Sequence, residues 1–292
     1  MKPSSIRRVV AVVSLVPMLC LLAPLPARAD LVGSIFVTGH DPDFHALLGG
    51  NAAGAQAISR DALNFVMDSG FNPFVAGGNE HVLFVECDTC AVPGGHVDGI
   101  AGLTDSLPAG VTFETHGAAD GLATALTQLG TKYSAIVIGS DFGGMLTQAE
   151  LDILDANSST IIDFLNSGGG LYAMSETAPG VGGLASSGFY GYLPFLVSTS
   201  PVSEAETGNT VTAFGAGLGL TDADVNGNFS HNVFTSTGGL NIVDTDPGSE
   251  ILSLAGRGKV TTTGVATPEP GSLAGLASVL LAFGLMRRKF AR

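Results

Sequence analysis

The densest group of chemically active side chains lies at residues 39–45, which read GHDPDFH. His40, Asp41, Asp43 and His45 place two imidazoles and two carboxylates within six residues. Such side chains bind divalent metals such as zinc or calcium, and they also suit a general base with an orienting acid. A third interpretation is a simple turn in which Asp41 acts as a cap and the histidines face solvent. The sequence leaves these three interpretations open.

A second candidate is a serine nucleophile. Ser175 and Glu176 follow an apolar segment, and His231 lies 56 residues further along the chain, where a base can follow its nucleophile. Ser175 lacks the glycines of the G-x-S-x-G turn, because Ala173 and Thr177 occupy those positions. We expect Ser175, Glu176 and His231 to be catalytic if the protein is a hydrolase. The alternative is a site without catalysis in which Ser175 only forms hydrogen bonds.

Cys87 and Cys90 are the two cysteines that lie beyond the apolar N-terminal segment. In an oxidising compartment a pair at this spacing closes a small disulfide, which is the arrangement we expect. Two alternatives are zinc ligation together with His96 and a redox-active pair. The redox alternative is the weaker one, because no evident helix begins at the pair.

Two further segments each have two interpretations. Residues 222–228 (DADVNGN) match the first half of a calcium loop, but Val233 stands where such a loop needs a bidentate Glu. An Asx-rich turn is the simpler interpretation of these residues. Residues 189–195 (FYGYLPF) suit the core or a hairpin, or else a platform on which sugars stack.

Short apolar segments alternate with amphipathic segments of helix length through residues 34–176, and these elements must position the candidate residues. We expect strands at residues 34–39, 81–86, 111–115, 135–140 and 170–175. Helices are expected at residues 52–68, 95–107, 118–129 and 147–166. Apolar strands that alternate with helices favour a parallel sheet covered on both faces. The predicted fold class is therefore α/β, with a doubly wound, mostly parallel five-stranded sheet of the flavodoxin type.

Ligands bind outside the carboxyl ends of the strands in such a sheet. His116 follows the third expected strand and Asp141 follows the fourth, so both join residues 40–45 as candidate ligand or metal residues. Ser175 and Glu176 follow the fifth strand. The candidate residues are thus expected to meet at one edge of the sheet.

The alternation ends after residue 176. We expect loops and antiparallel additions there, with short strands at residues 210–214, 241–243 and 250–254. The predicted ectodomain is residues 30–257, and residues 258–267 (GKVTTTGVAT) are expected to form a polar linker.

The N-terminus has the pattern of a secretory signal. Basic residues precede an apolar run at residues 9–25, and the small residues Ala27 and Ala29 suit a signal peptidase. We expect residues 1–29 to be removed by cleavage between Ala29 and Asp30. The mature protein is then exported.

The C-terminus combines three features. Pro268, Glu269 and Pro270 precede an apolar stretch at residues 272–286, and the basic residues Arg287, Arg288 and Lys289 follow it. As a helix this stretch spans about 22 Å, which is short of a hydrocarbon core of about 30 Å. We therefore expect a short transmembrane helix that anchors the chain weakly, with the basic residues on the cytoplasmic side.

This combination resembles the PEP-CTERM sorting signal over residues 268–292. The resemblance implies processing by an exosortase-type membrane enzyme of Gram-negative bacteria that make extracellular polysaccharide. It implies that the chain is anchored in the inner membrane before processing and lies at the cell surface or in the extracellular matrix afterwards. The expected partners are signal peptidase, the exosortase-type enzyme and an extracellular polysaccharide.

The charge of the chain is concentrated between these two ends. The whole chain has a net formal charge of −14, but residues 30–267 hold only four Lys and Arg against 25 Asp and Glu, which makes −21. So acidic a domain lacks the basic surface that phosphate backbones require, which excludes nucleic acid as a partner. It approaches anionic polymers only where a divalent cation bridges the two.

Residues 164–176 (FLNSGGGLYAMSE) resemble the helix, glycine turn, strand and elbow of the class I glutamine amidotransferase-like superfamily, including its ThuA-like branch. The amidotransferase elbow carries a nucleophilic Cys, whereas Ser175 stands at that place here. The resemblance therefore implies the fold without glutamine hydrolysis. We expect an exported, non-catalytic binding or matrix-associated module, and the alternative is a secreted hydrolase with a metal-based or Ser/His-based site.

Overall fold

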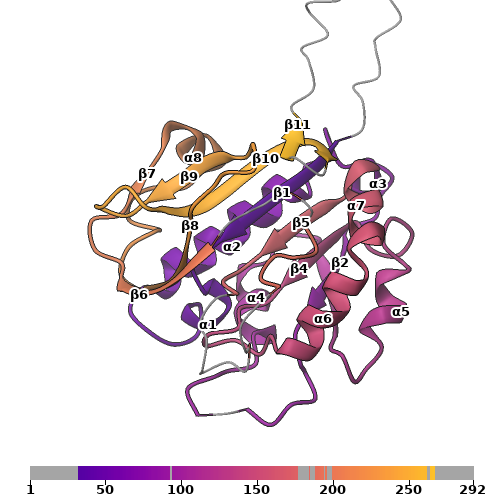
Figure 1. Cartoon of the computed structure of the whole chain (residues 1–292), viewed down its shortest axis with the longest axis horizontal. Coiled ribbons are helices and arrows are strands. Elements are labelled where there is room, and N and C mark those ends of the chain that lie inside the picture. The colour runs from indigo at the N-terminus through magenta and orange to yellow at the C-terminus, as the bar shows by residue number, and fades with distance from the viewer. Residues whose placement is uncertain are drawn as a thin grey trace, which may run out of the picture. The chain divides into compact units, whose positions relative to one another are not determined.

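Five apolar strands form the parallel part of a mixed α/β sheet (Figure 1). The structure is a computed structural model that describes residues 32–92, 94–176, 184, 188–193, 195, 199–261 and 264–266. The parallel strands are β1 (Gly33–Thr38), β2 (His81–Val85), β3 (Thr112–His116), β4 (Ala135–Ile138) and β5 (Gly170–Ala173). They lie in the order β3-β2-β4-β5-β1, so each of the five predicted strands is present.

Antiparallel strands extend the sheet beyond β1. They are β6 (Thr199–Ala205), β7 (Thr210–Val211), β8 (Phe229–Phe234), β9 (Asn241–Thr245), β10 (Ile251–Thr261) and β11 (Gly264–Ala266). β10 pairs with the whole of β1, and β8 and β6 follow it outward. β9 pairs with β10 and with β7. The loss of alternation after residue 176 thus marks the change from parallel to antiparallel pairing.

Helices cover both faces of the parallel strands. They are α1 (Pro42–His45), α2 (Ala52–Val66), α3 (Pro73–Ala76), α4 (Ile100–Ser106), α5 (Leu122–Leu126), α6 (Gln148–Ala156), α7 (Ser158–Asn166) and α8 (Ala213–Leu218). Successive side chains of a strand point to opposite faces. Ile35 and Val37 accordingly join the core that contains Leu154 of α6, whereas Phe36 joins the core that contains Leu63 of α2. Figure 1 shows α2 running along β1.

The predicted helix at residues 147–166 is two helices. Thr147 caps α6 with the expected capping box to Glu150. At Asn157 the side-chain amide donates to the carbonyl of Ile153 at 2.8 Å, and the backbone leaves the helical conformation with φ −105° and ψ 16°. Asparagine competes in this way with the backbone hydrogen bonds of a helix, which explains the break.

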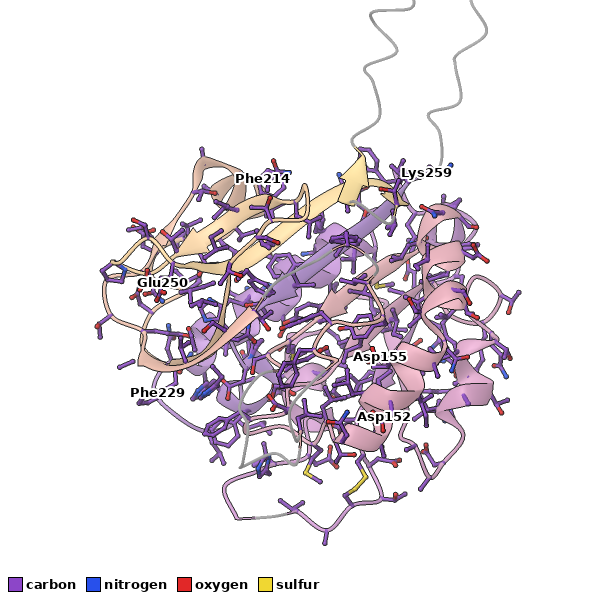
Figure 2. All side chains as sticks on the ribbon, in the orientation of Figure 1. Asp152, Asp155, Phe214, Phe229, Glu250 and Lys259 are labelled. Carbon is purple, nitrogen blue, oxygen red and sulfur yellow. A yellow bond between two sulfur atoms is a disulfide. The ribbon has the colours of Figure 1, made fainter. Side chains whose placement is uncertain are left out.

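The prediction of a linker at residues 258–267 is wrong for residues 258–261 and 264–266, which the structure describes as strands. Gly258 to Thr261 belong to β10, and Lys259 and Val260 pair with β11 in a hairpin. Figure 2 shows Glu250 and Lys259 at opposite ends of this long strand. Val260 and Val265 are buried, so the hairpin adds apolar area to the core. The valines of an otherwise polar sequence were the signal for this strand.

The predicted strand at residues 210–214 is also corrected. Only Thr210 and Val211 pair, with β9, because the side chain of Thr212 accepts a hydrogen bond from the backbone N–H of Gly215 and starts α8. The signal segment, the cleavage site Ala29–Asp30 and the sorting motif all lie outside the described residues. Among the described residues, the structure contains no helix with the length and apolar character of a membrane span.

Candidate functional site

The pairing of β8 with the segment after β1 builds the candidate site. His40 and Ser230 form an antiparallel bridge, and the backbone N–H of His231 donates to the carbonyl of Gly39 at 2.8 Å. α1 begins directly after Asp41, whose side chain makes no capping hydrogen bond. The predicted turn capped by Asp41 is therefore wrong, and the carboxylate of Asp41 is available for other contacts.

Asp41, His45 and His231 come together at this point. The Nε2 atom of His45 lies 3.1 Å from Oδ1 of Asp41, and the Nε2 atom of His231 lies 3.3 Å from Oδ2. All three residues are buried, with exposed fractions of 1%, 6% and 2% in chain order. One ligand atom from each lies within 4.8 Å of the others, and among the described residues this is the group that could hold a metal ion.

The helical turn α1 explains the first contact of this group. Residues four apart lie on the same face of a helix, so Asp41 and His45 face one another across one turn. The Nδ1 atom of His45 lies 2.9 Å from the carbonyl oxygen of Leu48, which fixes the ring. Burial opposes a charge on this ring, but Asp41 and the Leu48 carbonyl outweigh it and raise the pKa of His45.

His40 points into a different, fully buried contact. Its Nδ1 atom contacts Oε1 of Glu206, and its Nε2 atom lies 2.8 Å from Oδ2 of Asp244. Ser230 donates to the same Glu206 oxygen at 3.0 Å. Burial lowers the pKa of His40, but the two carboxylates outweigh burial and raise it well above its ordinary value. His40 is therefore a charged residue, and both of its nitrogens have partners within the protein.

Asp43 is likewise engaged by the chain. It accepts hydrogen bonds from the backbone N–H of Ser140 at 2.8 Å, from the Ser140 hydroxyl at 2.7 Å and from the N–H of Phe44 at 3.0 Å. Burial raises its pKa. Asp43 thus joins the ends of β1 and β4, and both of its oxygens already accept hydrogen bonds from the chain.

The predicted catalytic residues do not form a triad among the described residues. Ser175 is fully buried, its backbone N–H donates to the carbonyl of His40 at 3.1 Å, and its Oγ atom has no hydrogen-bond partner among those residues. Glu176 accepts hydrogen bonds from the Tyr192 hydroxyl at 2.5 Å and from the backbone N–H of Tyr190 at 2.6 Å. Burial raises the pKa of Glu176 to about 8. Among the described residues, Ser175 therefore has no hydrogen-bonded base of the kind that an activated serine requires.

The last two predicted ligand residues have different positions. Asp141 is fully buried beside the site: its backbone N–H donates to the carbonyl of Ser175 at 3.0 Å, and its charge contributes to the raised pKa of Glu176. His116 lies at the outer strand β3, where its partners are Glu114, Asp120 and Tyr133. β3 is the edge strand furthest from β1 among the parallel strands, so His116 lies apart from Asp41 and His45.

The remaining motifs are structural. Cys87 and Cys90 form a disulfide, drawn as a yellow bond in Figure 2. In the segment at residues 222–228, Asp224 accepts from the N–H of Thr221 and stabilises a turn, whereas Asp222 accepts from the N–H of Val211 and joins the segment to β7. In the segment at residues 189–195, the residues with the lowest exposure are Tyr190, Tyr192, Leu193 and Phe195. These four residues belong to the core.

Sequence reasoning missed Glu206 and Asp244, and it gave His231 a different role. Glu206 follows β6, which the sequence did not reveal, and Asp244 is an acidic residue inside the strand β9. A carboxylate in such a strand is rarely buried without a charged partner, and this was the one signal that the sequence contained. Comparison of the chain with protein-family models and with curated protein sequences gives no match.

Proposed function

We propose that this protein is an exported, surface-sorted module that binds a ligand at the carboxyl end of its parallel sheet and does not hydrolyse it. Its expected partners are an exosortase-type processing enzyme and extracellular polysaccharide. The PEP-CTERM-like C-terminus supports the sorting, and the signal-like N-terminus supports the export. The finer fold that we propose is the doubly wound, amidotransferase-like arrangement, which the segment at residues 164–176 favours.

One observation at the elbow carries the non-catalytic part of the proposal. The Oγ atom of Ser175 has no hydrogen-bond partner among the described residues, whereas a serine nucleophile needs a base at about 2.6–3.2 Å. The neighbouring Glu176 is held by Tyr190 and Tyr192. A carboxyl group with a pKa of about 8 is mostly protonated at neutral pH and cannot orient a catalytic histidine as an anion.

The nucleophile is tested with a fluorophosphonate probe, which labels activated serines. The purified full chain and its Ser175→Ala variant are incubated with the probe beside a serine esterase as a positive control. We expect no labelling of the full chain. Labelling that disappears in the Ser175→Ala variant would overturn the non-catalytic proposal and favour the hydrolase.

The sorting is tested by mass spectrometry of material from the native cells. We expect a chain that begins at Asp30 and ends near Pro268. A chain that keeps Arg292 at its end in the extracellular fraction would refute the processing. Binding to the extracellular polysaccharide of the same cells is then measured by co-sedimentation with and without divalent cations, because the net charge of −21 makes an anionic partner depend on them.

A further inference from the structure

We infer that Asp41, His45 and His231 form a mononuclear site for a divalent transition-metal ion, of which zinc is the representative. The inference deepens the proposed function, because it rests on the same end of the sheet and names a class of ligand for it. Two imidazoles and one carboxylate are a common set of protein ligands for zinc, with a further position left for water or substrate. Calcium is a poor fit, because it takes six or more oxygen ligands.

The distances within the group fit a shared metal ion. Ligands that each lie about 2.0–2.1 Å from a tetrahedral zinc ion are roughly 3.3 Å from one another. The two Nε2 atoms lie 3.1 Å and 3.3 Å from the Asp41 oxygens. A charge-assisted hydrogen bond between the same groups would be shorter, at about 2.7–2.9 Å. The His231 separation therefore matches that of neighbouring ligands, the His45 separation lies midway between the two values, and each imidazole faces a different oxygen of Asp41.

The carboxylate of Asp41 is the second, independent observation. Asp41 is 1% exposed, and neither of its oxygens accepts a hydrogen bond from a described residue. Nearby buried carboxylates differ, since Asp43 accepts three hydrogen bonds and Glu176 accepts two. A buried carboxylate without donors is costly, and a bound cation would remove that cost.

The surroundings of the histidines support the same assignment. The Nδ1 atom of His45 donates to the Leu48 carbonyl at 2.9 Å, so Nε2 is the ring nitrogen that faces Asp41. A histidine that binds a metal usually donates its other N–H to a carbonyl or a carboxylate in this way. The ring of Phe142 packs against His231 with centroids 3.9 Å apart and shields it.

The charge around the group is suited to a cation. His40 contacts both Glu206 and Asp244 in one buried group, so each of those carboxylates already has a partner within the chain. Asp41 supplies a carboxylate beside two imidazoles, which is a donor set that suits a divalent cation.

The test measures zinc binding to the tag-free full chain after removal of metal with a chelator. We expect one zinc ion per chain by elemental analysis and by titration calorimetry. Each of the variants Asp41→Asn, His45→Gln and His231→Gln should weaken zinc binding by more than about 100-fold. Substitution of residues that only hydrogen-bond to a metal ligand already lowers metal affinity by about 10–100-fold. The matched control is His116→Gln, which removes a surface histidine that also lies beside two carboxylates.

Three results would overturn the inference. The first is a chain that binds no zinc, and the second is zinc binding that survives in all three variants. The third is a cobalt-substituted wild-type chain without the visible absorption of a low-coordinate Co²⁺ ion, and this result decides the question if the variants fail to fold. A chain that binds no zinc would overturn the metal site alone, because the mass spectrometry of sorting and the fluorophosphonate labelling test the proposed function separately. Labelling at Ser175 overturns the non-catalytic role but not zinc binding.

Discussion

The Nε2 atom of His40 lies 2.8 Å from Oδ2 of Asp244, in a contact that buries both side chains. Glu206 contacts the other nitrogen of the same ring, so a cation is held between two carboxylates. His40 follows β1, Asp244 lies in β9 and Glu206 follows β6. The contact therefore ties the antiparallel strands to the first parallel strand beside the candidate metal site.

Removal of one partner from this contact should be costly. The variant Asp244→Ala leaves the buried imidazolium with one carboxylate, and we expect a loss of about 3–5 kcal/mol in the free energy of unfolding. Chemical denaturation measures the loss, and Asp105→Ala, at an exposed position of α4, is the control. Equal effects of the two substitutions would show that the contact does not stabilise the fold.

Glu176 should make stability fall as the pH rises. Its pKa is raised from 4.5 in the unfolded chain to about 8 in the folded protein, mainly by burial. The folded state therefore keeps a proton that the unfolded state releases, so the stabilisation is complete below pH 4.5 and is lost as the pH rises to about 8. One such proton gives a slope of up to about 1.4 kcal/mol per pH unit.

The variant Glu176→Gln removes this titration. We expect its free energy of unfolding to depend less steeply on pH over this interval than that of the wild type. The control is Glu80→Gln at an exposed position. A wild-type slope that is unchanged by Glu176→Gln would contradict the assignment.

Gly39 should be essential for the approach of β8 to β1. A Cβ atom at Gly39 would lie 1.8 Å from the carbonyl oxygen of Asn232. Rotation of a side chain cannot relieve this clash, because the Cβ atom and the carbonyl oxygen are both fixed to the backbone. We expect Gly39→Ala to cost about 1–3 kcal/mol and to weaken zinc binding, because His231 must move with β8. The control is Gly217→Ala in α8, where no atom lies within 4 Å and alanine should stabilise slightly. Unchanged stability and zinc affinity of Gly39→Ala would refute this constraint.

Arg257 should not be replaceable by lysine. Its guanidinium donates to Ser34, to the Phe65 carbonyl and to Asp68, and it stacks on the rings of Phe65 and Phe71. A lysine reproduces the charge but neither the fork of donors nor the planar stacking. We expect Arg257→Lys to lose about 1–2 kcal/mol of stability by denaturation. Lys259→Ala, at an exposed position of the same strand, should change little, and a Lys variant as stable as the wild type would contradict the argument.

Local patterns were sufficient for the parallel part of the fold. The apolar runs at residues 81–86 and 135–140 predicted β2 and β4, and Thr147 with Glu150 predicted the start of α6. Each of these signals depends on neighbours within a few residues. The antiparallel strands β6 and β8 have no comparable signal, because their pairing partners lie far away in the sequence and they are mixed polar and apolar.

The candidate site, too, was predictable from the sequence only where its residues are close neighbours along the chain. The sequence by itself determined that Asp41 and His45 lie close together, since only three residues separate them, and that polar residues follow the ends of the parallel strands. Only the tertiary structure decided that His231 joins them while His40 and Asp43 turn away. The physical reason is that β8 reaches the end of β1 through backbone hydrogen bonds to Gly39, and long-range pairing of this kind leaves no local trace in the sequence.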